Sequence, residues 1–240
     1  MENLSKRLSK WIENKVIGAK AKGVVLGLSG GIDSAVVAIL CKKSFPKNTL
    51  ALVIPCHSIN KDIEDALGLA KKFGISYKII DLSRIYDSFI SLLETTEKNA
   101  NFKLAEANIK SRLRMITLYF FANKLNYLVV GTGNKSEITV GYFTKYGDGG
   151  VDILPLGNLL KSQVIELAEC LKIPQEIIQK PPSAGLWEGQ TDEGEMGISY
   201  NQLDLYLKTG KLNNQGVEEK IQKKISISNH KRNTPAIPNF

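Results

Sequence analysis

Residues 23–34 read GVVLGLSGGIDS, a short apolar run that passes into a polar turn with two adjacent glycines. A continuous apolar run at 24–28 is typical of a strand buried on both faces of a parallel sheet. A helical pattern begins at Ser34, so the stretch predicts a strand, a tight turn and a helix. The glycines let the backbone turn sharply and approach a ligand closely, and the first amides of the following helix favour phosphate.

The strand-and-helix alternation continues outward from this stretch. Further apolar runs at 50–54, 77–80 and 127–130 predict three more strands. Helical patterns lie between them, at 34–43, 61–73, 85–94 and 102–124, and an amphipathic helix with Leu4, Leu8, Trp11, Ile12 and Val16 on one face precedes the first strand. The alternation predicts an α/β fold, a doubly wound, Rossmann-like parallel sheet with helices on both faces.

The pattern changes after residue 132. Residues 155–180 are expected to be helical with a break at Pro174, and 181–197 to form a long loop with four glycines. Helical stretches near 199–208 and 215–227 close the chain. We therefore expect residues 1–240 to form one domain with a helical C-terminal extension.

Composition excludes several protein classes. The chain has 240 residues, 43% apolar and 23% charged, which is ordinary for a globular protein and rules out disordered and collagen-like sequences. It shows neither an apolar run of membrane-spanning length nor a secretory signal. The three cysteines are far apart, so we expect reduced thiols and a cytoplasmic location. Two histidines are too few for most zinc or Ser-His-Asp sites.

The net charge of +8 is concentrated at the two ends. Residues 1–22 carry six basic and two acidic groups, and residues 208–232 carry seven and two, so the central part is close to neutral. A nucleic-acid partner would favour a basic stripe on the domain itself, which we do not expect here. The lysines either form a basic edge beside a phosphate-bearing small molecule or are simply solvated.

Asp33 stands at the rim of the predicted phosphate loop. A carboxylate would repel phosphate unless a divalent cation lies between them, so the loop is expected to bind phosphate together with such a cation. The loop has neither the Gly-Lys-Ser/Thr of a Walker A motif nor the spacing GxGxxG. The alternative is a structural strand-to-helix turn capped by an acidic or hydroxyl side chain.

The string SGGIDS resembles the pyrophosphatase loop of the N-type ATP pyrophosphatases. Further strings resemble ammonia-dependent NAD synthetases along essentially the whole chain: NIKSRLRM (108–115), VGTGNKSE (130–137), GYFTKYGD (141–148), KPPSAGLWEGQTDEGEMGISY (180–200) and HKRNTP (230–235). The resemblance implies an adenine nucleotide alpha hydrolase-like fold and ATP-dependent amidation of deamido-NAD by ammonia, through an acyl-adenylate, to give NAD, AMP and pyrophosphate. ATP is then a co-substrate.

The resemblance also implies a set of site residues. The positions similar to ATP ligands are Gly27, Leu28, Ser29, Gly30, Gly31, Ile32, Asp33, Ser34, Thr132, Lys161 and Ser183. Those similar to deamido-NAD ligands are Arg112, Lys145, Asp152, His230 and Lys231, and those similar to Mg²⁺ ligands are Asp33 and Glu137. Each taken singly also fits a solvated, capping or turn residue. The same resemblance implies a homodimer with deamido-NAD at the interface, and residues 181–197 are the candidate lid.

Two features depart from the family pattern or leave a role open. The segment after the second predicted strand, IPCHSINKD, has no arginine, which leaves the adenine-side contacts at 54–60 unassigned. The N-terminal glutamine-hydrolysing domain of longer relatives is not expected, so free ammonia is the expected nitrogen donor. Asp148 is the expected acceptor of the proton that ammonium must lose.

Two other functions compete with this interpretation. An RNA-adenylating enzyme of the same superfamily would carry more basic charge on the domain. A non-catalytic ATP-sensing module would not need two metal-binding carboxylates.

Overall fold

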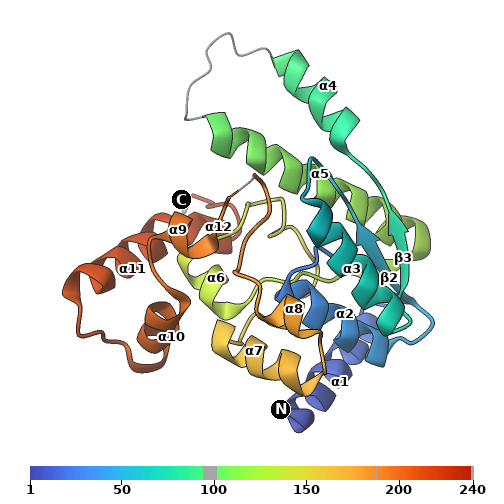
Figure 1. Ribbon diagram of the computed structural model, residues 1–240, viewed down its shortest axis with the longest axis horizontal. Coiled ribbons are helices and arrows are strands. Elements are labelled where there is room, and N and C mark those ends of the chain that lie inside the picture. The colour runs from blue at the N-terminus through green and yellow to red at the C-terminus, as the bar shows by residue number, and fades with distance from the viewer. Residues whose placement is uncertain (94–101, 188, 239–240) are drawn as a thin grey trace.

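The computed structural model describes residues 1–93, 102–187 and 189–238, and its centre is a four-stranded parallel sheet. The strands are β1 (Gly23–Gly27), β2 (Thr49–Val53), β3 (Ser76–Ile79) and β4 (Tyr127–Val129). Their order is β3-β2-β1-β4, so the chain moves outward from β1 to β3 and then returns to the other side of β1 (Figure 1). The predicted doubly wound sheet is confirmed, with strand bounds displaced by about one residue.

Alternate residues of each strand face opposite sides of the sheet, as the pleat requires. In β1, Val24 and Leu26 pack into one hydrophobic cluster and Val25 packs into the other. In β2, Ala51 joins the first cluster and Leu52 the second. Both faces are buried, which explains why these strands are continuous apolar runs in the sequence.

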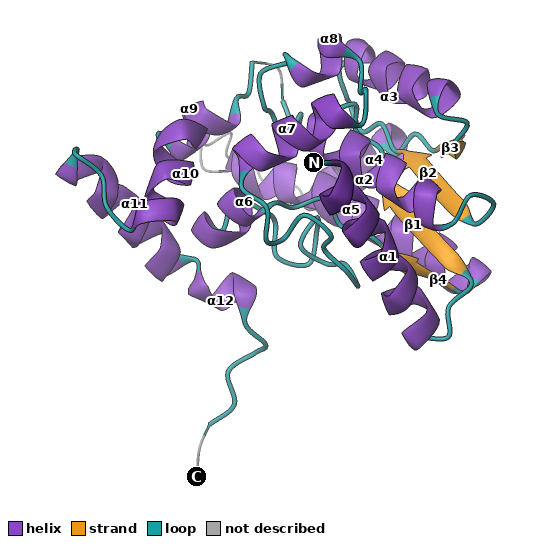
Figure 2. Ribbon diagram, turned by 90° about the horizontal axis from the view of Figure 1, so that it is seen from below, coloured by secondary structure: helices purple, strands orange, loops and turns teal. Residues whose placement is uncertain are grey.

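Helices cover the two faces unequally. The first face carries α1 (Glu2–Gly18), α2 (Ile32–Ser44), α3 (Asn60–Lys72), α7 (Lys161–Cys170) and the short α8 (Gln175–Ile178). The second face carries α4 (Ser83–Leu93) and the long α5 (Phe102–Leu125), which packs against β1 and β4. Figure 2 shows the sheet with α1, α2 and α3 around it.

The remaining helices form a separate cluster at the end of the molecule away from β3 (Figure 1). They are α6 (Lys135–Val140), α9 (Asp192–Met196), α10 (Tyr200–Thr209), α11 (Gln215–Ile227) and α12 (Asn229–Arg232). Their shared core contains Val140, Met196, Leu203 and Ile221. This cluster is the expected helical C-terminal extension, and α6 joins it to the segment after β4.

The structure corrects three local predictions. Residues 155–158 form turns and 159–160 are irregular rather than helical, because Pro155 and Gly157 interrupt the pattern, and the helix begins at Lys161. The predicted loop 181–197 contains α9, which Thr191 caps at its start and Gly197 ends with a φ of 60°. The short helix α6 was not predicted. Glu94, the last residue of the predicted helix 85–94, and Glu188 of the predicted loop lie outside the described residues.

Across the described part of the chain, every helix falls short of the length and apolarity needed to cross a lipid bilayer.

Candidate functional site

The turn after β1 forms a compact loop, residues 29–34, which we call the glycine loop. Ser34 Oγ lies 3.0 Å from Ser29 Oγ and donates to the Gly31 carbonyl at 2.9 Å. Gly30 has a φ of 81°, and a Cβ there would lie 2.2 Å from the Asp62 carbonyl oxygen, so only glycine fits. The loop runs directly into α2, whose first free amides therefore face the space beyond the carboxyl end of β1.

Asp33 and Glu137 lie on either side of one lysine. Asp33 is in the first turn of α2, Glu137 is in the first turn of α6, and Lys161 opens α7. Lys161 Nζ forms an ion pair with Asp33 Oδ2 and lies 3.6 Å from Glu137 Oε1. The Lys161 side chain is 3% exposed, whereas Asp33 and Glu137 keep 16% and 15% exposure. The predicted meeting of these two residues, called the carboxylate pair below, is present in the structure.

Asn134 holds the carboxylate pair together from the other side. It is fully buried and caps α6, since its side-chain oxygen accepts from the Glu137 amide at 3.0 Å. Its own amide donates to Glu137 Oε2 at 3.1 Å, which completes a capping box. Its side-chain nitrogen donates to Asp33 Oδ1 at 2.9 Å. One asparagine thus fixes both carboxylates relative to each other.

The negative charges of the carboxylate pair favour the binding of protons or cations, as the pKa values of Glu137 and Lys161 indicate. Burial, followed by the negative charge of Asp33, raises the pKa of Glu137 to about 8, although Lys161 opposes the shift. Burial on its own would lower the pKa of Lys161, but Asp33 and Glu137 outweigh it and raise that pKa. Tyr200 adds a hydroxyl between Glu137 Oε1, at 3.2 Å, and Asp192 Oδ2, at 2.9 Å.

The two carboxylates of the pair fit a magnesium ion whose other ligands are phosphate oxygens and water. In the described residues, the structure contains no group of three or more His, Cys, Asp or Glu side chains suited to holding a metal alone. Mg²⁺ is commonly bound by one or two carboxylates together with phosphate oxygens and water. Two partly exposed carboxylates beside the glycine loop match that requirement.

Thr132 and Ser183 approach the same region from two sides. Thr132 follows β4 and precedes α6, beside β1 at the carboxyl end of the sheet. Ser183 Oγ accepts from the Gly185 amide at 3.1 Å, and a Cβ on Gly185 would lie 3.6 Å from Asp62 Oδ2. Asp62 also lies against Gly30, so residues 183–185, called the Ser183 segment below, lie next to the glycine loop.

The predicted deamido-NAD residues form a second group, around residues 141–148 and α12. Lys145 Nζ donates to the His230 carbonyl at 2.6 Å, and Arg112 donates to the Lys145 carbonyl at 3.4 Å. Lys231 Nζ donates to the carbonyls of Gly141 and Phe143, both at 2.8 Å. Arg112, Lys145, His230 and Lys231 therefore lie around the loop 141–148. The side-chain donors of Arg112, Lys145 and Lys231 form hydrogen bonds with backbone carbonyls of the protein.

Asp148 and Asp152 are held by local hydrogen bonds. Asp148 Oδ1 accepts from Ser111 Oγ at 2.8 Å and from the Thr144 amide at 2.9 Å. Asp152 Oδ2 accepts from the Val129 amide at 2.7 Å, which ties the loop to the end of β4. Both carboxylates are fixed in direction, and both residues remain exposed.

Sequence reasoning missed several residues of this region. Arg114 of α5 donates to the Ile54 carbonyl at 3.1 Å and to Ser58 Oγ at 3.2 Å. It brings an arginine to the segment 54–60, where the local sequence has none. Asn134 could have been found, because an asparagine three residues before a glutamate is a capping-box signal. Tyr200 and Lys180 have no comparable local signal.

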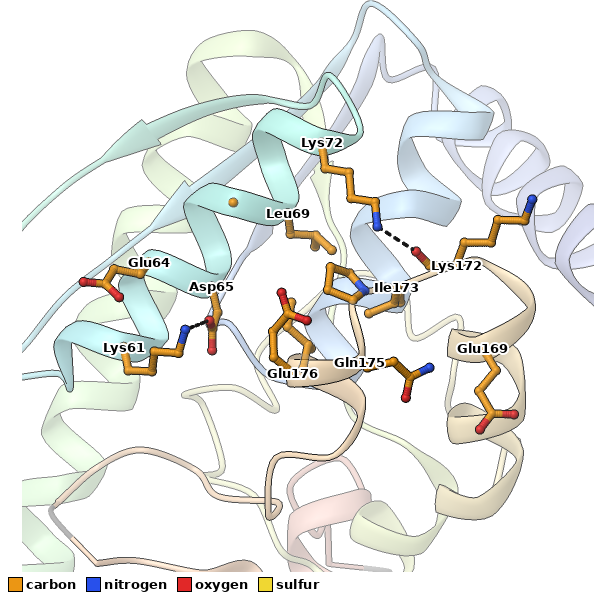
Figure 3. A pocket seen from close by; sticks show the side chains of 13 residues that line it. Lys61, Glu64, Asp65, Leu69, Lys72, Glu169, Lys172, Ile173, Gln175 and Glu176 are labelled. Carbon is orange, nitrogen blue, oxygen red and sulfur yellow. Dashed lines mark hydrogen bonds and ion pairs between the residues drawn. The ribbon is translucent and has the colours of Figure 1, made fainter.

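A separate hollow of about 770 Å³ lies between α3 and the α7–α8 region (Figure 3). Its lining includes Lys61, Asp65, Lys72 and Glu176 and contains none of the predicted site residues. The carboxylate pair, the glycine loop and the 141–148 group therefore define the candidate site, and this hollow does not.

Comparison with known proteins gives a consistent result. The sequence matches the NAD synthase family over residues 4–235. It is 49% identical to an NH3-dependent NAD+ synthetase of Carboxydothermus hydrogenoformans over 239 residues, which cover 99% of this chain and 97% of that protein. The fold is similar to the NMN synthetase of Francisella tularensis, with 41% identity, a TM-score of 0.94 and coverage of 100% and 98% of the two chains. It is also similar to the NH3-dependent NAD synthetase of Campylobacter jejuni, with 33% identity, a TM-score of 0.80 and coverage of 99% and 98%.

Proposed function

The chain belongs to the NAD synthase family, and on that premise we propose that it amidates deamido-NAD with ammonia at the expense of ATP. The observation that carries the proposal is the carboxylate pair beside the glycine loop, at the carboxyl ends of the paired strands β1 and β4, where the strand order reverses. Ligands of doubly wound sheets bind at this switch point. The pair also argues against a module that only senses ATP, because binding alone does not need two such carboxylates.

The reaction needs an activated carboxyl group, because ammonia does not displace oxide from a carboxylate. A nicotinate carboxylate oxygen bonds to the α-phosphorus of ATP, and the bond from that phosphorus to pyrophosphate breaks. Ammonia then bonds to the carbonyl carbon of the acyl-adenylate, and the bond to AMP breaks. Ammonium gives one proton to a base to become ammonia, the nitrogen gives a second proton to solvent after it has bonded to carbon, and the products are NAD, AMP and pyrophosphate. No enzyme nucleophile is required, so positioning and electrostatics supply the acceleration.

The glycine loop, the carboxylate pair, Lys161, Thr132 and Ser183 bind and orient ATP in this proposal. The glycine loop and the start of α2, including the amide of Ser34, donate N–H groups to the phosphates, with the hydroxyls of Ser29, Thr132 and Ser183 as further donors. Lys161 is held charged by Asp33 and Glu137 and offers its ammonium to a phosphate oxygen. Asp33 and Glu137 would hold Mg²⁺, which when bound neutralises charge on the departing pyrophosphate.

The residues of the second group orient deamido-NAD. Arg112, Lys145 and Lys231 supply positive charge for its phosphates and its nicotinate carboxylate. We assign the proton of ammonium to Asp148, whose Oδ1 is fixed by Ser111 and Thr144. The segment 181–197 would cover the acyl-adenylate and exclude water. Residues 1–240 act here as one catalytic domain with free ammonia as nitrogen donor.

A homodimer belongs to the same proposal and is supported by exposed apolar side chains on α4 and α5. Ile85 and Phe89 on α4 and Leu104, Ile116 and Phe120 on α5 are 44–61% exposed. Large exposed apolar side chains on adjoining helices are typical of protein–protein interfaces. These residues are our candidate dimer contacts.

A second candidate function differs only in the substrate. The similarity to a solved NMN synthetase, at a TM-score of 0.94, favours nicotinate mononucleotide as the carboxylate donor. The chemistry at the carboxyl group would be unchanged, and only the adenylate half of the dinucleotide would be missing.

One assay separates these candidates. The protein is incubated with ATP, Mg²⁺, ammonium and either deamido-NAD or nicotinate mononucleotide, and the products are identified by chromatography and mass spectrometry. AMP, pyrophosphate and NAD from the dinucleotide support the proposal, whereas a much higher kcat/KM for the mononucleotide would favour the second candidate. Absence of turnover with both substrates would refute both functions.

A further inference from the structure

Lys180 lies where three elements meet. Its Nζ lies 2.8 Å from Asp62 Oδ1, forms a second ion pair with Asp65 Oδ2, and donates to the Gly30 carbonyl at 3.4 Å. Asp62 and Asp65 are on the first turns of α3, Gly30 is in the glycine loop, and Lys180 itself precedes the Ser183 segment. The side chain is 24% exposed, and Asp62 and Asp65 outweigh its burial and raise its pKa, so it stays charged.

The contact with Gly30 fixes the orientation of one peptide group. A peptide is planar and trans, so the Gly30 carbonyl and the Gly31 N–H point in opposite directions. While Lys180 holds the carbonyl on the α3 side, the Gly31 amide points into the loop, where its partner is Ser29 Oγ at 3.3 Å. Rotation of this peptide would turn a carbonyl oxygen towards the phosphate position and repel the anion.

The same lysine links the glycine loop to the segment that carries Ser183. Asp62 uses Oδ1 for Lys180, while its Oδ2 lies beside Gly185. The backbone oxygen of Asp62 packs against Gly30. Lys180 and Asp62 therefore join both predicted ATP-binding segments to the first turn of α3.

We propose that Lys180 is a positioning residue for ATP: it holds the Gly30–Gly31 peptide with its amide towards the phosphates and docks the Ser183 segment against the glycine loop. The inference rests on the proposed function for its consequence in turnover, but its effect on ATP binding can be measured independently of product formation.

Lys61 provides a matched control. It is also a lysine that pairs with Asp65, at 2.9 Å from Oδ1, and Figure 3 shows it reaching that carboxylate from the adjoining turn of α3. Its side chain is 61% exposed, and its ion-pair partner is Asp65 rather than any group of the glycine loop. Lys61→Met therefore removes an ion pair to the same aspartate and leaves the Gly30 contact in place.

The experiment compares Lys180→Met, Lys180→Arg and Lys61→Met with the unmodified protein. Calorimetric titration with Mg-ATP gives Kd, and steady-state assays give kcat and KM for each substrate. Loss of a charge-assisted contact predicts that Lys180→Met raises the Kd and KM for ATP about tenfold. The KM for ammonia should stay unchanged, Lys180→Arg should recover part of the loss, and Lys61→Met should stay within about twofold.

The inference is overturned if Lys180→Met binds ATP as Lys61→Met does, or if kcat falls while the Kd and KM for ATP stay unchanged. If the unmodified protein yields no amide product, the proposed function fails, while the ATP titrations still decide the role of Lys180. If Lys180→Met does not fold, Lys180→Met combined with Asp65→Asn removes the unpaired buried charge and is titrated instead. Should that variant also fail to fold, the lysine serves folding rather than ATP positioning, and the inference is again overturned.

Discussion

Replacing Asn134 with alanine should destabilise the protein and separate the carboxylate pair. The substitution removes the cap of α6, which typically contributes about 1 kcal/mol. It also removes the hydrogen bond to the charged Asp33, which contributes about 2 kcal/mol. The expected loss is therefore about 3 kcal/mol, which in a chain of this length corresponds to a decrease in Tm of roughly 6–12 °C.

Asn214→Ala is the matched control for this prediction. Asn214 also caps a helix, since its side chain accepts from the Val217 amide at the start of α11, but it is exposed and has no carboxylate partner. It should lose only the cap, about 1 kcal/mol or roughly 2–4 °C. Thermal unfolding followed by circular dichroism measures both variants, and pyrophosphate release measures their activity. Equal decreases in Tm for the two variants, with normal pyrophosphate release from Asn134→Ala, would refute the reasoning.

Four further predictions follow from the site and the ion pairs. Asp33→Asn should reduce pyrophosphate release at least about a hundredfold with an unchanged circular dichroism spectrum, since Lys161 keeps Glu137 as partner; a folded variant of full activity would contradict the magnesium role. Asp148→Asn should slow amide formation, measured as NAD formed with ammonium, and leave adenylation intact, measured as pyrophosphate released in a single turnover without ammonium; an equal loss in both half-reactions would remove Asp148 as the proton acceptor. Burial raises the pKa of Asp65, but its lysine partners outweigh it and lower the pKa. The ionised Asp65 carboxylate stabilises the fold fully at pH values above its unfolded pKa of about 4, and this stabilisation is lost as the pH falls through its lower pKa in the folded protein. The free energy of unfolding, measured with urea, should therefore fall less steeply with decreasing pH below about 4 in Asp65→Asn than in the unmodified protein. An equally steep fall in both proteins would contradict the pairing. Phe120→Glu should shift the sedimentation coefficient from dimer to monomer, and a wild-type protein that is monomeric and active would remove the dimer from the proposal.

The central fold could be predicted from the sequence because its signals are local. The runs 24–28 and 50–54 are apolar throughout, since both faces of the sheet are covered, and the helices between them are long enough to show a period. The short helices α6 and α9 could not be found in this way. Each has six residues or fewer, so a cap at the start and a glycine at the end are their only local signals.

The candidate site was only partly predictable for a related reason. Asp33 and Glu137 belong to recognisable strings, and their positions after β1 and β4 placed them at one edge of the sheet. Asn134 and Lys180 act through contacts with residues 101 and 150 positions away. The capping role of Asn134 is readable from its spacing to Glu137, but its contact with Asp33 and the contact of Lys180 with Gly30 depend on the packed structure.

The pairing of β1 with β4 has a consequence for the growing polypeptide. Gly23 stands opposite Tyr127, so the central strand stays open on that side until more than a hundred further residues have been made. A chain released early would carry the glycine loop without Glu137 or Lys161. Contacts between such distant residues form slowly. Until they form, the carboxylate pair is not assembled, so the proposed cleavage of ATP cannot occur in a partly synthesised or misfolded chain.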